Sequence, residues 1–388
     1  MYMINNLISA SILILFSVFT QSANALDPIE PIQKSSQTTI LSTETIKEIR
    51  GIHITSWHAG SKKMRDKLLK NIDNSVINTV VIALKETDGR VYIPGVALAD
   101  TYGSTLKAIP NPKEMMEDFD KRSIYTIGRI VLFKDSFLPK LFPELGVKNL
   151  TGELWRDRKG GTWTDQYNKK IWKYNIQLAQ EAAKLGFDEI QFDYIRYPSE
   201  GKISDCRYSK PHNSKTAVKN IINFLKYAKK HLKPYKVKIS AAVFGLTTTA
   251  KTDMGIGQDI KLIAENTDFV YPMMYPSHYY PGQYGLKNPD SEPYHVINFG
   301  LHDALNKLDK DYYKLRPYLQ DFSIGYKYGP HEVRAQILAA KFNSLKSWIL
   351  WNPSNRYNWK ALTPESYRSF INPYYTDSNQ KTEIREQN

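Results

Sequence analysis

The stretch 188-DEIQFDYIRYP-198 alternates polar and apolar side chains along a β-rich run that ends at a proline. Successive side chains of a strand point to opposite faces of its sheet. The pattern therefore predicts one apolar face and one polar face, made respectively of Ile190, Phe192 and Tyr194 and of Glu189, Gln191 and Asp193. Such a strand would be ordinary in a half-exposed sheet. Whether its polar face points to solvent or to the protein interior depends on the rest of the chain.

Seven other β-rich runs alternate with segments of helical period. Together with 188–195, the predicted strands are 51–57, 78–86, 124–133, 238–245, 268–275, 315–322 and 347–352. Segments with apolar residues at three-and-four spacing include 63–72, 168–186, 214–232, 258–266 and 331–345. Eight such alternations over roughly 300 residues predict an α/β fold of the (β/α)8 TIM barrel type in a single domain, and a doubly wound open sheet is the alternative.

The two ends of the chain differ from this central pattern. An apolar run at 7–19, followed by Ala23 and Ala25, predicts a signal peptide over 1–25 that is cleaved after Ala25. Because no Lys or Arg precedes the run, an uncleaved anchor is the alternative. We expect a linker or N-terminal strap over 26–47, the barrel over 48–371, a flexible tail over 372–388, and a secreted or periplasmic protein without stable membrane insertion.

Composition narrows the classes of function. Cys206 is the single cysteine, so an intramolecular disulfide and paired-cysteine metal sites are excluded. The chain contains no GxxxxGK[ST], HExxH or GxSxG motif, and we expect no metal or cofactor. The net charge of +14 indicates either an acidic partner such as an anionic polysaccharide or a Lys-rich solvated surface. Nucleic acid fits poorly with the predicted export.

In a barrel, the polar face of 188–195 would point into the interior. The same holds for His53, Thr55 and Trp57 in the first strand and for Arg316, Tyr318 and Gln320 in the seventh. An unpaired buried polar group costs about 1–3 kcal/mol, so this interior must be a hydrogen-bonded network or a ligand site. We expect Glu189 to pair with Arg316 or Arg129. Chemistry in barrels lies at the carboxyl ends of the strands, which makes Asp193 the first catalytic candidate.

Further side chains with binding chemistry lie at or near the predicted strand ends. Cations, amides and aromatic rings together suit a sugar, because rings stack on the apolar faces of pyranoses and planar polar groups bind hydroxyls. We expect Trp57, Tyr275 and Trp351 to stack on sugar rings and Arg196 to orient a carboxylate or hydroxyls. The full set of predicted substrate-binding residues is His53, Trp57, Lys85, Arg129, Gln191, Arg196, Tyr275, Gln320, Trp351 and Asn352.

Two motifs, 187-FDEIQFDYIRYP-198 and 347-SWILWNPSNRYNW-359, resemble glycosyl hydrolase domain families of (β/α)8 fold, and GIHITSW and RPYLQDF resemble first- and seventh-strand signatures of the same group. The resemblance spans Gly51 to Asn358 and implies hydrolysis of glycosidic bonds. More distantly, the fourth strand is similar to a chitinase-type pattern in which an aspartate acts through the substrate's acetamido group. Asp193 takes the place of that aspartate, but Ile195 stands where the pattern has its catalytic glutamate.

Glycoside hydrolysis usually needs two carboxylates, about 5–5.5 Å apart for retention or about 6.5–9.5 Å apart for inversion. Asp321 and Glu86 are the candidates for the second, although strand alternation places both opposite the interior unless the chain has turned. Asp193 could otherwise act with the substrate's acetamido group. The prediction is an exported glycoside hydrolase acting on an extracellular or cell-envelope polysaccharide containing amino sugars. The alternatives are a non-catalytic glycan-binding barrel or an enzyme of another class on the same fold.

The long segment 136–167 between the third strand and its helix is expected at the catalytic end of the barrel. Its Trp155, Arg156 and Trp163 would line sugar subsites or pack within a lid.

Overall fold

The computed structural model describes residues 48–368, which form a closed barrel of eight parallel strands. Each strand pairs with the next in sequence, and β8 pairs with β1, so the predicted (β/α)8 barrel is confirmed and an open sheet is ruled out. The predicted signal peptide, strap and tail lie outside the described residues. The strands are β1 (Arg50–Ile54), β2 (Thr79–Lys85), β3 (Tyr125–Val131), β4 (Glu189–Asp193), β5 (Lys238–Phe244), β6 (Phe269–Met274), β7 (Tyr318–Gln320) and β8 (Trp348–Trp351).

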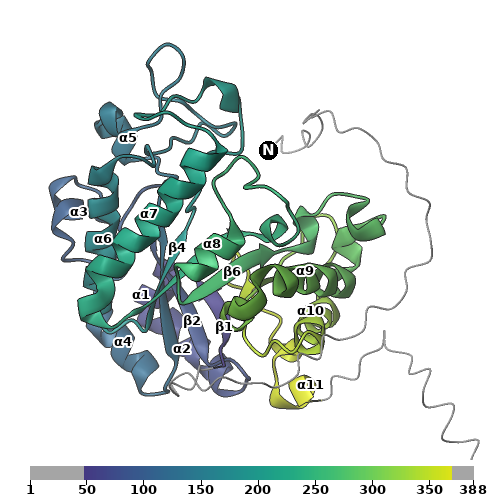
Figure 1. Cartoon of the computed structure of the whole chain (residues 1–388). Helices are drawn as coiled ribbons and strands as arrows, with labels where there is room; N and C mark the ends of the chain where they lie inside the picture. The colour runs from purple at the N-terminus through teal and green to yellow at the C-terminus, as the bar shows by residue number, and fades with distance from the viewer. Residues whose placement is uncertain (1–47, 369–388) are drawn as a thin grey trace, which may run out of the picture. The chain divides into compact units, whose positions relative to one another are not determined.

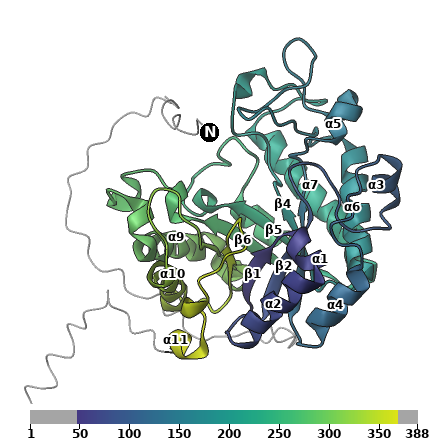
Figure 2. The same cartoon turned by 180° about the vertical axis from the view of Figure 1, so that it is seen from behind.

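Helices surround the barrel, with α6 and α7 packed side by side on one flank and α9 and α10 on another (Figures 1 and 2). Two helices, α4 of nine residues and α9 of 16, lie outside the segments predicted from sequence period. The helices are α1 (Ser56–Gly60), α2 (Lys62–Asp73), α3 (Ala97–Thr101), α4 (Pro112–Asp120), α5 (Leu138–Leu141), α6 (Lys169–Lys184), α7 (Ser214–Leu232), α8 (Ile260–Glu265), α9 (Pro293–Leu308), α10 (Pro330–Phe342) and α11 (Pro364–Arg368).

The sequence sets the ends of the helices around β4. Asn168 caps α6 by accepting a hydrogen bond from the backbone N–H of Lys170. Gly186 follows α6 with φ +97°, which glycine adopts without a steric cost, and the chain then turns into β4. Asn213 and Thr216 form a reciprocal capping box at the start of α7.

The polar alternation of β4 separates two environments, as predicted. On the outer side, Phe192 packs against Phe224 of α7, with ring centroids 5.1 Å apart. On the inner side, Glu189 accepts a hydrogen bond from Arg316 at 3.0 Å, and Gln191 accepts one from the hydroxyl of Tyr318 at 2.6 Å. Because β4 and β7 are not neighbours in the sheet, these contacts cross the interior. The predicted pairing of Glu189 with Arg316 is confirmed.

The first strand is shorter than predicted. Thr55 ends it because its hydroxyl accepts a hydrogen bond from the backbone N–H of His58 and thereby caps α1. Trp57 therefore lies in α1 and is 55% exposed, so the prediction that it faces the barrel interior is wrong. The seventh strand is also shorter, Tyr318–Gln320 in place of 315–322.

Candidate active site

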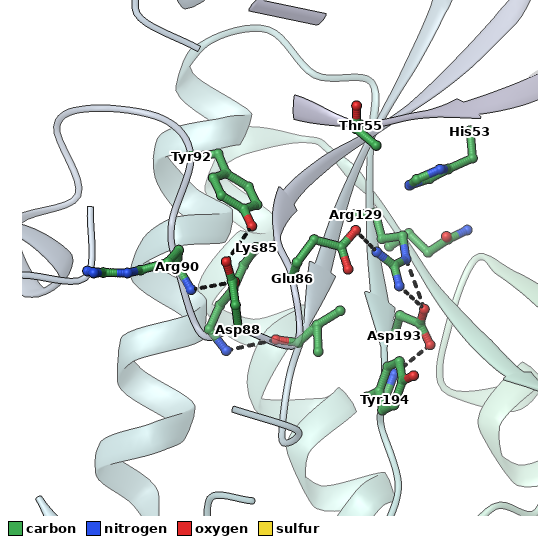
Figure 3. A network of polar contacts seen from close by, with 12 residues as sticks. His53, Thr55, Lys85, Glu86, Asp88, Arg90, Tyr92, Arg129, Asp193 and Tyr194 are labelled. Carbon is green, nitrogen blue, oxygen red and sulfur yellow. Dashed lines mark hydrogen bonds and ion pairs between the residues drawn. The ribbon is translucent and has the colours of Figure 1, made fainter. Parts of the chain in front are cut away.

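Two carboxylates and one arginine meet at the carboxyl end of the barrel (Figure 3). Arg129, on β3, donates to Asp193 Oδ2 from Nε at 2.9 Å and from Nη2 at 2.6 Å. Its remaining terminal nitrogen, Nη1, donates to Glu86 Oε1 at 2.6 Å. The guanidinium thus joins the ends of β2, β3 and β4. We call Glu86, Arg129 and Asp193 the bridged carboxylate pair.

The shared guanidinium limits the distance between the two carboxylates. Each accepting oxygen lies 2.6 Å from a terminal nitrogen of the same planar group. The two oxygens are therefore at most about 8 Å apart, which is below the upper limit of about 9.5 Å for paired glycosidase carboxylates. Glu86 is 31% exposed and Asp193 4% exposed in their side chains, so the pair borders solvent chiefly through Glu86.

A β-bulge places Glu86 in this pair. The pairing of β2 with β3 shifts register between Ala83 and Lys85, and a bulge re-aims the side chains that follow it. Lys85 is fully buried and pairs with Asp135 at 2.9 Å, while its ammonium also donates to the carbonyl of Val131. Regular strand alternation predicted Lys85 at the site and Glu86 on the opposite face, and the bulge exchanges these two positions. The ammonium of Lys85 binds groups of the protein itself.

Asp193 is fixed by the backbone as well as by Arg129. Its Oδ1 accepts a hydrogen bond from the backbone N–H of Tyr194 at 2.6 Å. Tyr194 has φ +49°, which is uncommon for a bulky residue and concentrates at functional sites. The strand therefore ends in a strained turn that points Asp193 at Arg129. Strand alternation predicted Tyr194 on the apolar face with Ile190 and Phe192, and nothing in the sequence indicates a left-handed turn at a tyrosine.

Burial and neighbouring charge set the protonation of this site. Burial raises the pKa of Glu86 above its ordinary value; Arg129 opposes the rise and Asp193 adds to it. Burial, helped by the charge of Arg129, lowers the pKa of His53 well below its ordinary value. His53 is therefore neutral. Neither of its ring nitrogens has a hydrogen-bond partner within residues 48–368.

An open pocket adjoins the bridged carboxylate pair. It has a cavity volume of about 530 Å³ and is lined by residues that follow β6, β7 and β8, among them Tyr275, Asp321 and Asn358. Trp351 belongs to both places, because its ring lines the pocket and also lies 5.0 Å from the Arg129 guanidinium. His53 stacks on Trp351 with ring centroids 3.9 Å apart. The indole is thus held between the pair and the pocket.

Asp321 is a buried carboxyl in this pocket, 1% exposed, whose oxygens accept hydrogen bonds from the backbone and side chain of Asn358. Burial raises its pKa to about 7, although the bonds from Asn358 act in the opposite direction. Asp321 is thus a second candidate acid, in the pocket rather than in the bridged carboxylate pair.

The raised pKa of Asp321 predicts a specific dependence of stability on pH. Because the folded protein holds this proton more tightly than the unfolded chain, the stabilisation is full below the ordinary pKa of 3.8 and is lost as the pH rises to about 7. Relative to wild type, Asp321→Asn should gain about 2–4 kcal/mol in free energy of unfolding between about pH 4 and pH 8. Denaturant titrations of both proteins at about pH 4 and about pH 8 measure this difference in free energy of unfolding. Asp120→Asn, at an exposed position, is the control and should show no such change.

The side-chain amides of three further predicted binding residues form hydrogen bonds within the protein. Gln191 is buried in the interior under Tyr318, and Gln320 accepts from the backbone N–H and hydroxyl of Ser277. Asn352 lines the pocket, but its amide donates to the carbonyls of Asp321 and Arg356. These amides hold the mouth of the barrel together.

Arg196 lies apart from the bridged carboxylate pair. It is 4% exposed, and its guanidinium donates to the carbonyl of Tyr197 and the hydroxyl of Ser199. The rings of Trp163, Tyr194 and Phe244 surround it at 4.9, 4.8 and 4.5 Å. Such an enclosure supports the loop after β4 and leaves little of the cation for a ligand.

The segment 136–167 packs against the barrel rather than opening a groove with its tryptophans. Trp155 and Trp163 are 3% and 2% exposed and belong to the apolar core. Arg156 is exposed and donates to the carbonyl of Gly160. The packing alternative for the two tryptophans is therefore the correct one.

Within residues 48–368, no group of three or more His, Cys, Asp or Glu side chains is placed to hold a metal ion. In the same part of the chain, no helix is both long and apolar enough to cross a membrane.

Comparison with known proteins gives a family for most of the chain. Residues 51–357 match the family model described as "Putative glycosyl hydrolase domain". A hypothetical protein from Ruminiclostridium thermocellum is 35% identical over 49% of this chain and 96% of its own, with a TM-score of 0.45. No curated protein sequence gives a significant match.

Other solved structures share the fold at low identity. The PgaB (BpsB) glycoside hydrolase domain from Bordetella bronchiseptica has a TM-score of 0.61 at 13% identity and covers 83% of this chain and 98% of its own. An α-galactosidase from Thermus thermophilus in complex with stachyose has a TM-score of 0.50 at 11% identity, covering 82% of this chain and 63% of its own.

Proposed function

The chain belongs to the glycosyl hydrolase domain family that matches residues 51–357, and from this we propose that it hydrolyses glycosidic bonds in an extracellular or cell-envelope polysaccharide. The observation that carries the proposal is the bridged carboxylate pair. Two carboxylates from different strands converge on one guanidinium at the carboxyl end of a barrel, where this fold keeps its chemistry. Glycoside hydrolysis usually needs such a pair of carboxylates, and the shared guanidinium keeps these two at most about 8 Å apart.

The environments of the two carboxylates support different roles for them. Glu86 is the more exposed, and its raised pKa suits a general acid that protonates the leaving oxygen. Asp193 accepts two hydrogen bonds from Arg129 and one from the backbone of Tyr194, an arrangement that suits an ionised carboxylate. Asp193 would stabilise the positive charge that develops on the sugar ring. Arg129 would hold both groups in register.

The neighbouring pocket supports binding of a sugar. Trp351 and Tyr275 are among the residues that line it, and aromatic rings stack on the apolar faces of pyranoses. The position of Asp193 in a chitinase-like strand motif supports an amino sugar in the substrate, and the apolar run at 7–19 supports export.

A glycan-binding protein without catalysis is the second candidate. It is favoured by one observation, which is that Arg129 already occupies both carboxylates. The test is release of reducing ends from a panel of bacterial polysaccharides by the purified protein. Release from any polymer supports hydrolysis. Binding to a polymer of which no bond is ever cleaved would establish the second candidate.

The leaving group tests the role of Glu86. Once a cleaved sugar is identified, Glu86→Gln should lose at least about 10²-fold in kcat/KM on the natural linkage but far less on an aryl glycoside, whose leaving group needs no proton. Wild-type kcat/KM should fall as the pH rises through the raised pKa of Glu86, because the acid is then ionised. Equal losses on both substrates would assign the acid elsewhere, with Asp321 as the next candidate.

A further inference from the structure

One of the residues that line the pocket beside the bridged carboxylate pair is an arginine whose guanidinium is unpaired within residues 48–368. Arg356 lines the pocket from the loop after β8 and is exposed. Its carbonyl accepts a hydrogen bond from Asn352, but its guanidinium makes no hydrogen bond or ion pair with any residue of 48–368. Arg129 and Arg196, at the same end of the barrel, are by contrast occupied by carboxylates or enclosed by rings.

The other groups around the pocket compensate this charge at most in part. Asp321 is the one acidic residue among those that line it, and that carboxyl is buried, bonded to Asn358 and has a pKa of about 7. Burial lowers the pKa of His278, against the influence of Asp290, so the imidazole is neutral at neutral pH. Tyr275 and Trp351 supply aromatic faces. The pocket thus combines sugar-stacking rings with one free guanidinium.

We propose that this pocket is a subsite for an acidic sugar, whose ring packs on Trp351 or Tyr275 and whose carboxylate is bound by Arg356. The inference rests on the proposed function, since it names the class of glycan that the site takes. A guanidinium presents a planar pair of donors that matches a carboxylate, and an arginine without a protein partner loses no internal contact when it binds one. The net charge of +14 would in addition draw an anionic polymer toward the protein.

The place of the subsite follows from Trp351. This ring lines the pocket and also lies 5.0 Å from the guanidinium that bridges Glu86 and Asp193. A sugar stacked on Trp351 is therefore next to the carboxylates. The acidic unit would occupy a position adjoining the bond that is cleaved.

Binding measurements on matched ligands test the subsite without requiring catalysis. The probes are uronic-acid-containing bacterial polysaccharides, each paired with its carboxyl-reduced form, in which the acid is replaced by a neutral hydroxymethyl group. The protein is the Glu86→Gln variant, in which the polymer should survive the experiment. We expect at least one acidic polymer to bind about tenfold or more tightly than its reduced form.

Substitution of Arg356 locates the effect. In the Glu86→Gln variant, the additional substitution Arg356→Gln should remove the preference for the acidic polymer and leave the affinity for the reduced polymer unchanged. Arg356→Lys should keep part of the preference, because it retains the charge without the planar donors. The control is Arg122→Gln, which removes an equal charge. Arg122 is exposed, lies in the loop before β3 and pairs with Asp73 of α2, so its substitution should leave the affinity for both polymer forms unchanged.

Three results would overturn the subsite: no polymer prefers its acidic form, Arg356→Gln weakens both forms equally, or Arg122→Gln reproduces the loss. The proposed function fails separately. If no bond is cleaved by wild type while acid-selective binding depends on Arg356, the subsite stands and the protein is a glycan-binding barrel.

Discussion

Asp193→Asn is expected to reduce release of reducing ends by at least about 10³-fold. The substitution keeps the shape of the side chain and the acceptor for the backbone N–H of Tyr194, but it removes the negative charge that faces the reacting sugar. Because the amide oxygen that accepts from Tyr194 leaves the NH2 group facing the two Arg129 donors that Oδ2 accepts in the wild type, we also expect a loss of about 1–3 kcal/mol in free energy of unfolding. The assay is kcat/KM on the cleaved polymer, at a temperature where the variant is folded.

The same strand offers a matched control. Glu189 is also a buried carboxylate paired with an arginine, Arg316, but it lies at the opposite end of β4. Glu189→Gln should therefore lower the free energy of unfolding and leave kcat/KM within a few-fold of wild type. If Glu189→Gln abolishes activity while Asp193→Asn retains it, the site has been placed at the wrong end of the barrel.

Arg129→Met is expected to have the largest effect on stability, a loss of about 3–5 kcal/mol in free energy of unfolding. Removal of the guanidinium leaves Glu86 and Asp193 close together without a cation between them. Arg122→Met, at an exposed ion pair with Asp73, is the control and should cost less than about 1 kcal/mol. Denaturant unfolding measures both.

Two additional measurements show whether the loss comes from unpaired carboxylates. In the Arg129→Met background, Asp193→Asn should restore part of the stability, because one of the two like charges is then absent. The deficit of Arg129→Met should also be smaller near pH 5 than near pH 8, since protonation removes the same repulsion at low pH. A deficit that is independent of pH and not relieved by Asp193→Asn would mean that Arg129 acts mainly through packing.

Local sequence patterns were sufficient for the fold and for part of the site. The alternation in 188–195 correctly separated the interior set from Ile190 and Phe192, and Arg316 was one of the two arginines expected to pair with Glu189. This worked because the two-residue period of a strand is a property of consecutive residues. The same reasoning placed Asp193 at the carboxyl end of β4, where it is found.

Alternation failed where the backbone departs from a regular strand. The bulge in β2 exchanges the roles of Lys85 and Glu86, and the capping of α1 by Thr55 carries Trp57 out to solvent. Both features depend on hydrogen bonds that replace the regular backbone bonding between strands, and a periodic pattern of apolar residues does not predict them.

The sequence by itself determined the barrel, the inward face of its fourth strand and one catalytic candidate, because each follows from short-range periodicity. The tertiary structure decided that Glu86 and Asp193 share Arg129 and that Trp351 joins this pair to a pocket. It also decided that the guanidinium of Arg356, which lines the pocket, has no partner among residues 48–368. These residues lie far apart in the chain. Their distances are fixed only when the barrel closes and brings the ends of β2, β3, β4 and β8 to one mouth.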